Sequence, residues 1–437
     1  QLWVLAAAGT LAAVTLAGLT GPAVLIALTF AIALGTAFTA PAFQATVPEL
    51  VPPVALPQAV ALNSLGVNIA RAIGPALGGL LVALSGPAAV FALNAVSVSG
   101  VVLVLWRWRR SPSASALPPE HFGAALGTGL RYAAESPALQ RVLVRSIAFF
   151  LFASALWALL PIVARRELGL DAGGYGLLLA ALGCGAVAGA LLLPRLRSRI
   201  ALNRLTIAAA FVFAGASATL GAARSFPVAL GVLFLAGAAW IAMMAALNGA
   251  AQFAVPAWVK ARALAIYLLV FQGSMTAGAA LWGWVAATWS VPVALGTAAA
   301  SLVAALLLAV RYPLEDARPD LAPSRHWPDP APVAEPDRGP VLVTIEYRVD
   351  PERVADFVRA LAPLRRIRRR DGARQWGIHE DSERPGALIE AFTVPSWLEH
   401  LRQHERVTRA DREVQQALHA FHLDPEPPRV RHWIAPR

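Results

Sequence analysis

Polar residues inside an apolar helix are the first candidates for chemistry in this sequence, and Arg71 is the most prominent of them. If residues 64–84 form a helix, Asn68, Arg71, Pro75 and Gly78 recur at spacings of three and four and share one face. A cation in hydrocarbon costs at least about 2.5–3.5 kcal/mol, so Arg71 should face protein or a wet cavity. It either lines a transport pathway together with Asn68 or only holds helices together.

A small-residue motif, Gly-Pro-x-x-Gly-Gly, follows Arg71 and consists of Gly74, Pro75, Gly78 and Gly79. Small residues let a neighbouring transmembrane helix approach closely, so we expect close packing at these glycines. Two polar residues in later apolar stretches, Asn248 and Gln272, are expected to line the opposite side of the same pathway.

The composition is that of a polytopic membrane protein. Of the 437 residues, 57% are hydrophobic and 14% are charged, and the mean hydropathy is +0.58. Residues 1–311 hold 17 Lys and Arg against 5 Asp and Glu, whereas residues 312–437 hold 20 against 21. The basic excess therefore belongs to membrane loops and does not indicate a nucleic-acid surface. The single cysteine, Cys184, excludes an intramolecular disulfide.

Ten apolar stretches are long enough to span a bilayer of roughly 30 Å. They are Leu2–Leu19, Pro22–Phe43, Ser64–Leu84, Pro87–Trp106, Val142–Val163, Gly173–Leu193, Leu205–Ala222, Pro227–Leu247, Ala263–Trp284 and Val291–Val310. Lys and Arg concentrate in the connections after the fourth, sixth and eighth stretches. Such an excess marks the cytoplasmic side, so both ends of the chain are predicted to be cytoplasmic.

An internal repeat indicates two parallel halves. The segment Gln44–Pro48 recurs as Gln252–Pro256, six stretches later and in the same predicted orientation. This arrangement is typical of a transporter built from six plus six spans. The second half then has six spans and the first half four, so we expect that two spans are missing before Gln1.

These features predict five regions. They are an incomplete N-terminal half in 1–110, a cytoplasmic linker in 111–140 with an amphipathic helix at Phe122–Ala134, a C-terminal half in 141–312, a Pro-rich linker in 313–340, and a soluble domain in 341–437.

The soluble domain is expected to have a βαββαβ order and a ferredoxin-like sheet with helices on one face. The predicted strands are Val341–Tyr347, Arg374–His379, Ala387–Phe392 and Val430–Ile434, and one helix is expected over Ser396–His419. We place Trp376 or Ile378 on the open face of the sheet, where a second copy would pack.

Residues 1–311 contain few groups suited to catalysis or proton transfer. None of their five carboxylates lies in mid-span, and Glu49, at the end of the second stretch, is the nearest candidate for a coupling group or else an ordinary loop acid. In the tail, His379 and Trp376 would point from a strand, and the spacing of His400 and His404 could bind a metal. Surface or interior residues are the simpler interpretation, so we predict no metal site, no catalytic residue and no cofactor. No nucleotide-binding motif supports an ATP-driven pump.

The sequence resembles the major facilitator superfamily, and specifically the bacterial branch of transmembrane secretion effectors and enterobactin-exporter-like permeases. The resemblance covers essentially the whole chain and is carried by residues 41–51, 62–79, 90–97 and 174–196. It implies an all-α polytopic membrane fold, of which ten of twelve spans are present, followed by an α+β ferredoxin-like domain. In that superfamily the Gly-Pro-x-x-Gly-Gly motif marks antiporters that export their substrates, although Ala70 stands here in place of an earlier glycine.

A second family motif implies a cytoplasmic gate. The residues that match it, or that the resemblance groups with it, are Gly189, Arg195, Arg197, Arg199 and Glu49. The acidic residue expected in the second half is missing from this pattern, which puts the charge pair of that gate in doubt.

The tail from Val341 resembles antibiotic-biosynthesis-monooxygenase-like dimeric α/β barrels, some of which oxidise quinols without metal or flavin. We therefore expect a proton-coupled exporter of a small amphipathic or anionic molecule in the bacterial inner membrane. Its partners would be the lipid bilayer, the substrate, the coupling proton and, through the tail, a second copy of the chain; no nucleic acid is expected. Two alternatives remain for the tail: it oxidises a quinol-type compound that the permease then exports, or it only dimerises.

Overall fold

The computed structural model describes residues 1–51, 56–108, 122–316, 319–324, 326–327, 335 and 337–436, and for part of residues 40–83 it describes only the backbone. The chain divides into two compact units. The first unit lies within 1–114, 143–249 and 268–316, and the second lies within 115–142, 250–267 and 317–437.

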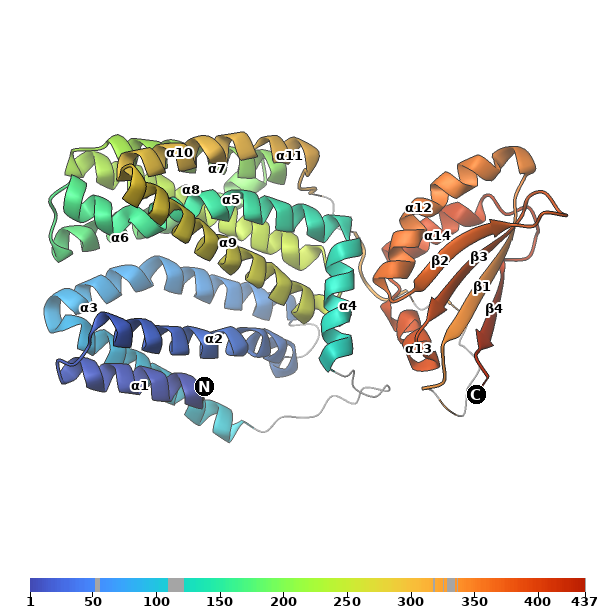
Figure 1. Ribbon diagram of the computed structural model, residues 1–437, viewed down its shortest axis with the longest axis horizontal. Helices are drawn as coiled ribbons and strands as arrows, with labels where there is room; N and C mark the ends of the chain where they lie inside the picture. Colours follow the sequence, from blue (N-terminus) through green and yellow to red (C-terminus); the bar gives the residue numbers. More distant parts are fainter. Residues whose placement is uncertain are drawn as a thin grey trace. The chain divides into compact units, whose positions relative to one another are not determined.

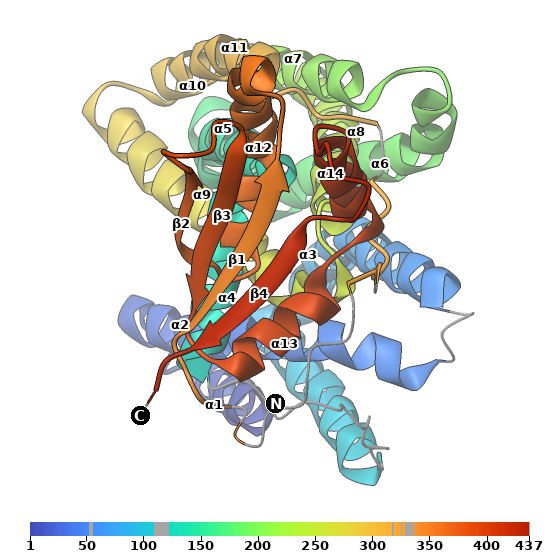
Figure 2. The ribbon, with the colours of Figure 1, turned by 90° about the vertical axis from the view of Figure 1, so that its right-hand side faces the viewer.

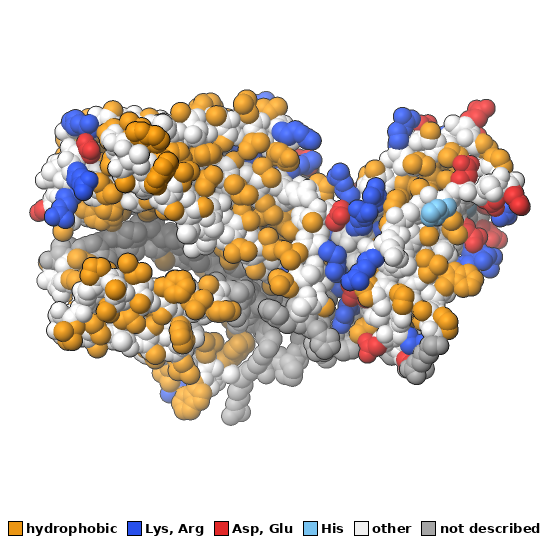
Figure 3. Space-filling model, in the orientation of Figure 1, with side chains coloured by type: hydrophobic (Ala, Val, Ile, Leu, Met, Phe, Trp, Pro, Cys, Tyr) orange, Lys and Arg blue, Asp and Glu red, His pale blue; other side chains and the backbone are white. Residues whose placement is uncertain are grey.

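Long apolar helices build the first unit (Figure 1). They are α1 (Leu2–Leu16), α2 (Pro22–Leu50), α3 (Leu56–Arg107), α5 (Pro137–Ile162), continued by a π-helical turn at Val163–Glu167, α6 (Ala172–Arg197), α7 (Leu202–Ala222), α8 (Phe226–Phe253), α9 (Lys260–Thr288), α10 (Val291–Ala305) and α11 (Leu307–Arg311). Within the described residues, eight helices are long and apolar enough to cross a membrane. Hydrophobic side chains accordingly dominate their surface (Figure 3). A helix suits the hydrocarbon core of a membrane because it satisfies its backbone polar groups internally.

Helix α3 contains a break. It covers two predicted stretches, Ser64–Leu84 and Pro87–Trp106, which are separated by non-helical backbone at Gly86. The φ of Gly86 is 77°, a left-handed conformation that glycine adopts without steric cost. The label α3 therefore covers two helices that meet at Gly86, in agreement with the two predicted stretches.

Glycines set the closest helix contacts in the first unit. A Cβ added at Gly185 of α6 would overlap the carbonyl of Phe234 in α8, and one at Gly237 of α8 would overlap the carbonyl of Leu182. Gly278 of α9 lies equally close to α5. Helices α6 and α8, and likewise α9 and α5, are therefore held by backbone contact at small residues.

The second unit contains a four-stranded antiparallel sheet in the order β2-β3-β1-β4. Its strands are β1 (Val341–Arg348), β2 (Arg374–Glu380), β3 (Ala387–Val394) and β4 (Arg429–Ile434). One face is covered by α12 (Val354–Arg370), α13 (Trp397–Arg406) and α14 (Arg409–His419), as Figure 2 shows. Apolar side chains between these layers form the core, with Phe357 completely buried.

Two details of the tail differ from the sequence-based prediction. The predicted helix Ser396–His419 is two helices, because Val407 is extended and Thr408 starts α14 with a capping box to Asp411. The placement of Trp376 or Ile378 on the open face was wrong, since both pack against the core under the helices. In β2, Ile378 is paired with the fully buried Glu390 of β3, which fixes that face as the inner one.

The second unit also includes segments that adjoin the apolar helices in sequence. Helix α4 (Phe122–Glu135) confirms the predicted amphipathic helix and packs against α12. A 3-10 turn, η3 (Ala257–Val259), lies between α8 and α9 and contacts α4.

Candidate functional site

The predicted pathway residues of the first half lie in α3. The side chains of Arg71 and Asn68, like those of Pro75, Gly79 and Glu49, fall outside the described part of the structure. The helical backbone is nevertheless continuous over Asn68, Arg71 and Pro75, which are spaced three and four residues apart.

The motif glycines of α3 show no close helix approach among the described residues. A Cβ added at Gly74 or Gly78 would meet no atom within 4 Å. The close contacts expected there occur instead in α6 and α8, where Gly189, predicted as part of a gate, would place a Cβ 2.8 Å from Ala238. Gly189 is thus buried in a helix interface.

On the predicted opposite side of the pathway, Asn248 is half-buried near the end of α8 and Gln272 is exposed on α9. Between their helices and α5 lies an aromatic cluster around Trp240, which sequence analysis did not single out. The ring centroid of Trp240 is 5.2 Å from Trp157 and 5.6 Å from Phe150, and Phe150 lies 4.4 Å from Phe271.

Trp157 gives this cluster a polar group. Its Nε1 is buried and has no hydrogen-bond partner within the described residues. A buried donor without a partner is costly, and such a group can be satisfied by an oxygen atom of a ligand. The cluster therefore combines aromatic faces for an apolar body with one N–H for a polar substituent.

Arg145 in α5 is a second cation within an apolar stretch, and the emphasis on Arg71 alone overlooked it. The side chain is 5% exposed, and it donates from Nη1 to Asn203 Oδ1 at 3.0 Å and from Nη2 to Thr206 Oγ1 at 2.9 Å. It also lines a small pocket with Phe149 and Met243. The partners just named are neutral, so Arg145 keeps its positive charge uncompensated by them.

Arg197, a residue of the predicted cytoplasmic gate, forms an ion pair with an acid from a distant segment. Asp316, after α11, lies 3.2 Å from Arg197 and accepts hydrogen bonds from the backbone N–H of Leu202 at the start of α7. Arg195 and Arg199 are exposed on the surface. Arg197 thus pairs with an acid 119 residues away in the sequence, which motif spacing could not reveal.

The core of the tail contains a fully buried acid, Glu390, that accepts hydrogen bonds from three side chains. Glu390 is fully buried and accepts from Arg368 Nε at 3.0 Å, from Trp376 Nε1 at 2.8 Å and from the Tyr347 hydroxyl at 3.3 Å. Burial and the neighbouring Glu390 carboxylate raise the pKa of Tyr347 well above its usual range. Every contact of this acid is internal, which is the pattern of a structural polar network.

The predicted histidine pair is in contact. His400 Nε2 and His404 Nε2 are 3.3 Å apart, and His400 is 2% exposed. Burial, together with the neighbouring His432 and His404, lowers the pKa of His400 to about 3, so this ring is neutral at physiological pH. The exposed His379 points elsewhere, from β2. The described residues contain no group of three or more potential metal ligands.

This chain matches one family model and is similar to a curated protein. A family model described as transmembrane secretion effector matches residues 1–437. An uncharacterized MFS-type transporter of Sinorhizobium fredii is 29% identical over 193 residues, which are 43% of this chain and 47% of that protein. The chain thus spans about half the length of the curated relative it matches.

Two solved structures are similar to this chain at low sequence identity. A fucose:proton symporter of E. coli is 17% identical, with 71% of this chain and 82% of that chain covered and a TM-score of 0.49. A bacterial homologue of the human lysosomal transporter Spinster, in an inward-facing and unoccupied conformation, is 16% identical, with 71% and 81% covered and a TM-score of 0.47.

Proposed function

We propose that this chain, which belongs to the transmembrane secretion effector family, moves a small amphipathic or anionic molecule out of the cell as a proton-coupled secondary transporter. The observation that carries this proposal is the family match along the whole of residues 1–437. The outward direction rests on the Gly-Pro-x-x-Gly-Gly motif of α3, which resembles that of exporting antiporters.

The substrate would bind between the two halves and be exposed to each side of the membrane in turn. In this proposal Arg71 and Asn68 line the site from α3, and Asn248 and Gln272 line it from α8 and α9. The permanent charge of Arg71 favours an anionic group. The aromatic cluster supports an amphipathic substrate, because it offers ring faces beside the free N–H of Trp157.

We assign proton coupling and gating to residues at the predicted cytoplasmic ends of the helices. Glu49 is our candidate for the proton-binding group, since it is the nearest carboxylate to the motif of α3. We assign the ion pair of Arg197 and Asp316 to the cytoplasmic gate, because it ties the end of α6 to the start of α7. The Lys and Arg bias supports an inner-membrane protein with both ends of this chain in the cytoplasm.

The strand order β2-β3-β1-β4 supports a ferredoxin-like domain of the dimeric α/β barrel type for the tail. Its outer sheet face carries the exposed Leu342 and Trp433, which are neighbours in β1 and β4 and suit a sheet-to-sheet homodimer. Light scattering of the full chain in detergent tests this, and a monomer would contradict it. The inner space is filled by the core and by the buried pair of Glu390 and Arg368, which favours an interaction role over oxidation of a quinol.

Efflux of carboxyfluorescein, an anionic amphipathic dye, from preloaded cells tests the proposed function. Cells that express the chain should lose dye faster than cells with an empty vector, and a protonophore should abolish the difference. Faster dye loss that survives the protonophore would contradict proton coupling. If neither this dye nor a panel of related anions leaves faster, the proposed substrate class is wrong.

A further inference from the structure

We propose that the tail is an intramolecular latch that binds the cytoplasmic loop between α8 and α9 and holds linker helix α4 against that loop. The contacts lie within the second unit, which groups α4, residues 250–267 and the tail in one compact body. Two arginines of the tail and two aromatic residues, Tyr132 of α4 and Trp258 of the loop, form the interface.

Tyr132 joins the linker helix to the loop. It is 1% exposed, and its hydroxyl donates to the carbonyl oxygen of Ala254 at 2.9 Å. Its ring meets that of Trp258 edge-on, with centroids 5.8 Å apart. Helix α4 also touches the start of α9 at Gly129, where a Cβ would come within 3.1 Å of the Cβ of Arg262. Burial raises the pKa of Tyr132 to about 12, so the hydroxyl remains a donor at physiological pH.

The tail covers both aromatic rings with guanidinium groups. Arg370 lies over the ring of Tyr132, 5.6 Å from its centroid, and Arg406 lies over the ring of Trp258, 4.9 Å from its centroid. Both arginines are at least nine-tenths buried. A cation–π contact is stronger when it is desolvated than when it is exposed to solvent. The interface is therefore specific for planar cations over aromatic rings.

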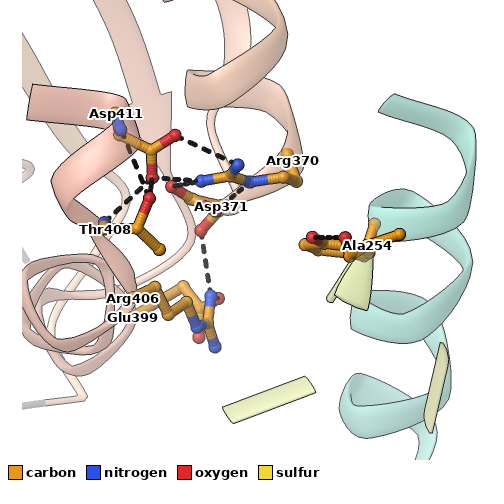
Figure 4. A network of polar contacts seen from close by, with 8 residues as sticks. Ala254, Arg370, Asp371, Glu399, Arg406, Thr408 and Asp411 are labelled. Carbon is orange, nitrogen blue, oxygen red and sulfur yellow. Dashed lines mark hydrogen bonds and ion pairs between the residues drawn. The ribbon is translucent and has the colours of Figure 1, made fainter. Parts of the chain in front are cut away.

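Ion pairs inside the tail hold these two arginines in position (Figure 4). Arg370 forms a bidentate pair with Asp371 and a second pair with Asp411, with contacts between 2.7 and 3.2 Å. Arg406 donates to the carbonyl oxygen of Asp371 at 2.9 Å and to Glu399 at 2.6 Å. Because these partners fix the guanidinium planes, the tail presents a preorganised surface.

The loop and the linker are continuous in sequence with transport helices. Residues 254–259 connect α8 with α9, and α4 is followed after one residue by α5. A transporter of this class works by moving one half against the other, and α4 lies in the chain segment between the halves. A tail that fixes α4 to the loop therefore restrains the segment between the two halves. This segment must change conformation during each transport cycle.

Amide hydrogen exchange of the full chain in detergent tests the latch without any substrate. Trp258→Leu removes the ring from the loop and leaves the core of the tail untouched, whereas Trp258→Phe keeps an aromatic face. We expect exchange in residues 122–135 and 250–259 to rise about tenfold in Trp258→Leu and to stay within about twofold of wild type in Trp258→Phe. Unchanged exchange in Trp258→Leu would overturn the proposal. An equal rise in β1 and β3 would also overturn it, because the tail itself would then be unfolding.

A reducible cross-link tests the effect on transport. Arg369 and Glu135 form an ion pair of 3.9 Å between the tail and α4, so cysteines at both positions, with Cys184→Ser, can be joined by a short bis-methanethiosulfonate. We expect carboxyfluorescein efflux to fall several-fold on cross-linking and to recover after reduction, while each single-cysteine control is unaffected. Unchanged efflux from fully cross-linked protein, or no cross-link at all, would overturn the latch. Wild-type chain that does not expel the dye would instead count against the proposed function, and hydrogen exchange alone would then decide on the latch.

Discussion

Two arginines, Arg145 and Arg71, lie in apolar helices, and they can be assigned different roles. Arg145 has an amide and a hydroxyl as fixed partners, which suits a residue that ties α5 to α7. Arg71 shares a helix face with Asn68 and Pro75, which suits a residue that meets the substrate. The first assignment follows from described contacts, and the second remains a proposal.

Substitution of Arg71 should separate substrate binding from a structural role. We expect Arg71→Ala to abolish export while membrane abundance and thermal stability stay near wild type. Arg71→Lys keeps the charge but loses the planar donor geometry, so it should weaken substrate affinity and retain some export. Export rates are measured beside abundance and melting temperature. If Arg71→Ala loses abundance together with export, Arg71 is a helix staple and the pathway role is wrong.

His400 should make the tail sensitive to acid. Its folded-state pKa of about 3 lies below the unfolded value of about 6.5, so protonation favours the unfolded tail and stability falls as pH drops through 6.5. The neighbouring His404, His432 and Arg368 all lower the pKa of His400 as well. From pH 7 to pH 5 the loss should be about 2 kcal/mol.

Thermal unfolding of the tail within the full chain, followed by near-ultraviolet circular dichroism at both pH values, measures this loss. His400→Gln should remove most of the pH dependence, whereas the exposed control His379→Gln should keep it. Equal pH dependence in both variants would contradict the assignment to His400.

Helix α8 offers a matched pair of glycines for testing helix packing. Gly237→Ala places a methyl group against the carbonyl of Leu182 and should destabilise the chain by about 1–3 kcal/mol. Gly231→Ala lies in the same helix with no atom within 4 Å, so it should be neutral or slightly stabilising. Melting temperatures in detergent compare the two variants. Equal stability would show that α6 and α8 do not approach as closely as described.

Local patterns were sufficient to predict several elements. Alternating apolar residues located the four strands, and the amphipathic pattern located α4. The same patterns could not tell which face of β2 is inner, because alternation separates two faces without identifying the covered one. The break between α13 and α14 did have a local signal, the capping box of Thr408 and Asp411, which sequence analysis overlooked.

Site residues that depend on tertiary contact were less predictable. Asp316 reaches Arg197 from a distant segment, and Arg406 reaches Trp258 from another region of the chain. Neither pair has a characteristic spacing in the sequence, so no sequence motif could predict that the two residues are in contact. Arg145 was visible as an arginine in an apolar stretch, but its role depends on Asn203 and Thr206 of a different helix.

At the scale of the whole molecule, the latch requires the tail to be on the same side of the membrane as α4. The predicted topology places residues 107–141, 195–204 and 312–437 in the cytoplasm. A reporter fused after Pro340 should therefore be active only if it is an enzyme that works in the cytoplasm. Activity of a periplasmic reporter at that position would reverse the predicted orientation.

The central claim, export in exchange for protons, is tested most directly in everted membrane vesicles whose lumen is acidified and monitored with a pH-sensitive dye. Carboxyfluorescein added outside reaches the cytoplasmic face, so an exporter should carry it inward and release luminal protons. We predict a rise in luminal pH with the wild-type chain and none with Arg71→Ala at equal abundance. Dye that accumulates in vesicles without proton release, or identical responses from the two proteins, would contradict the account.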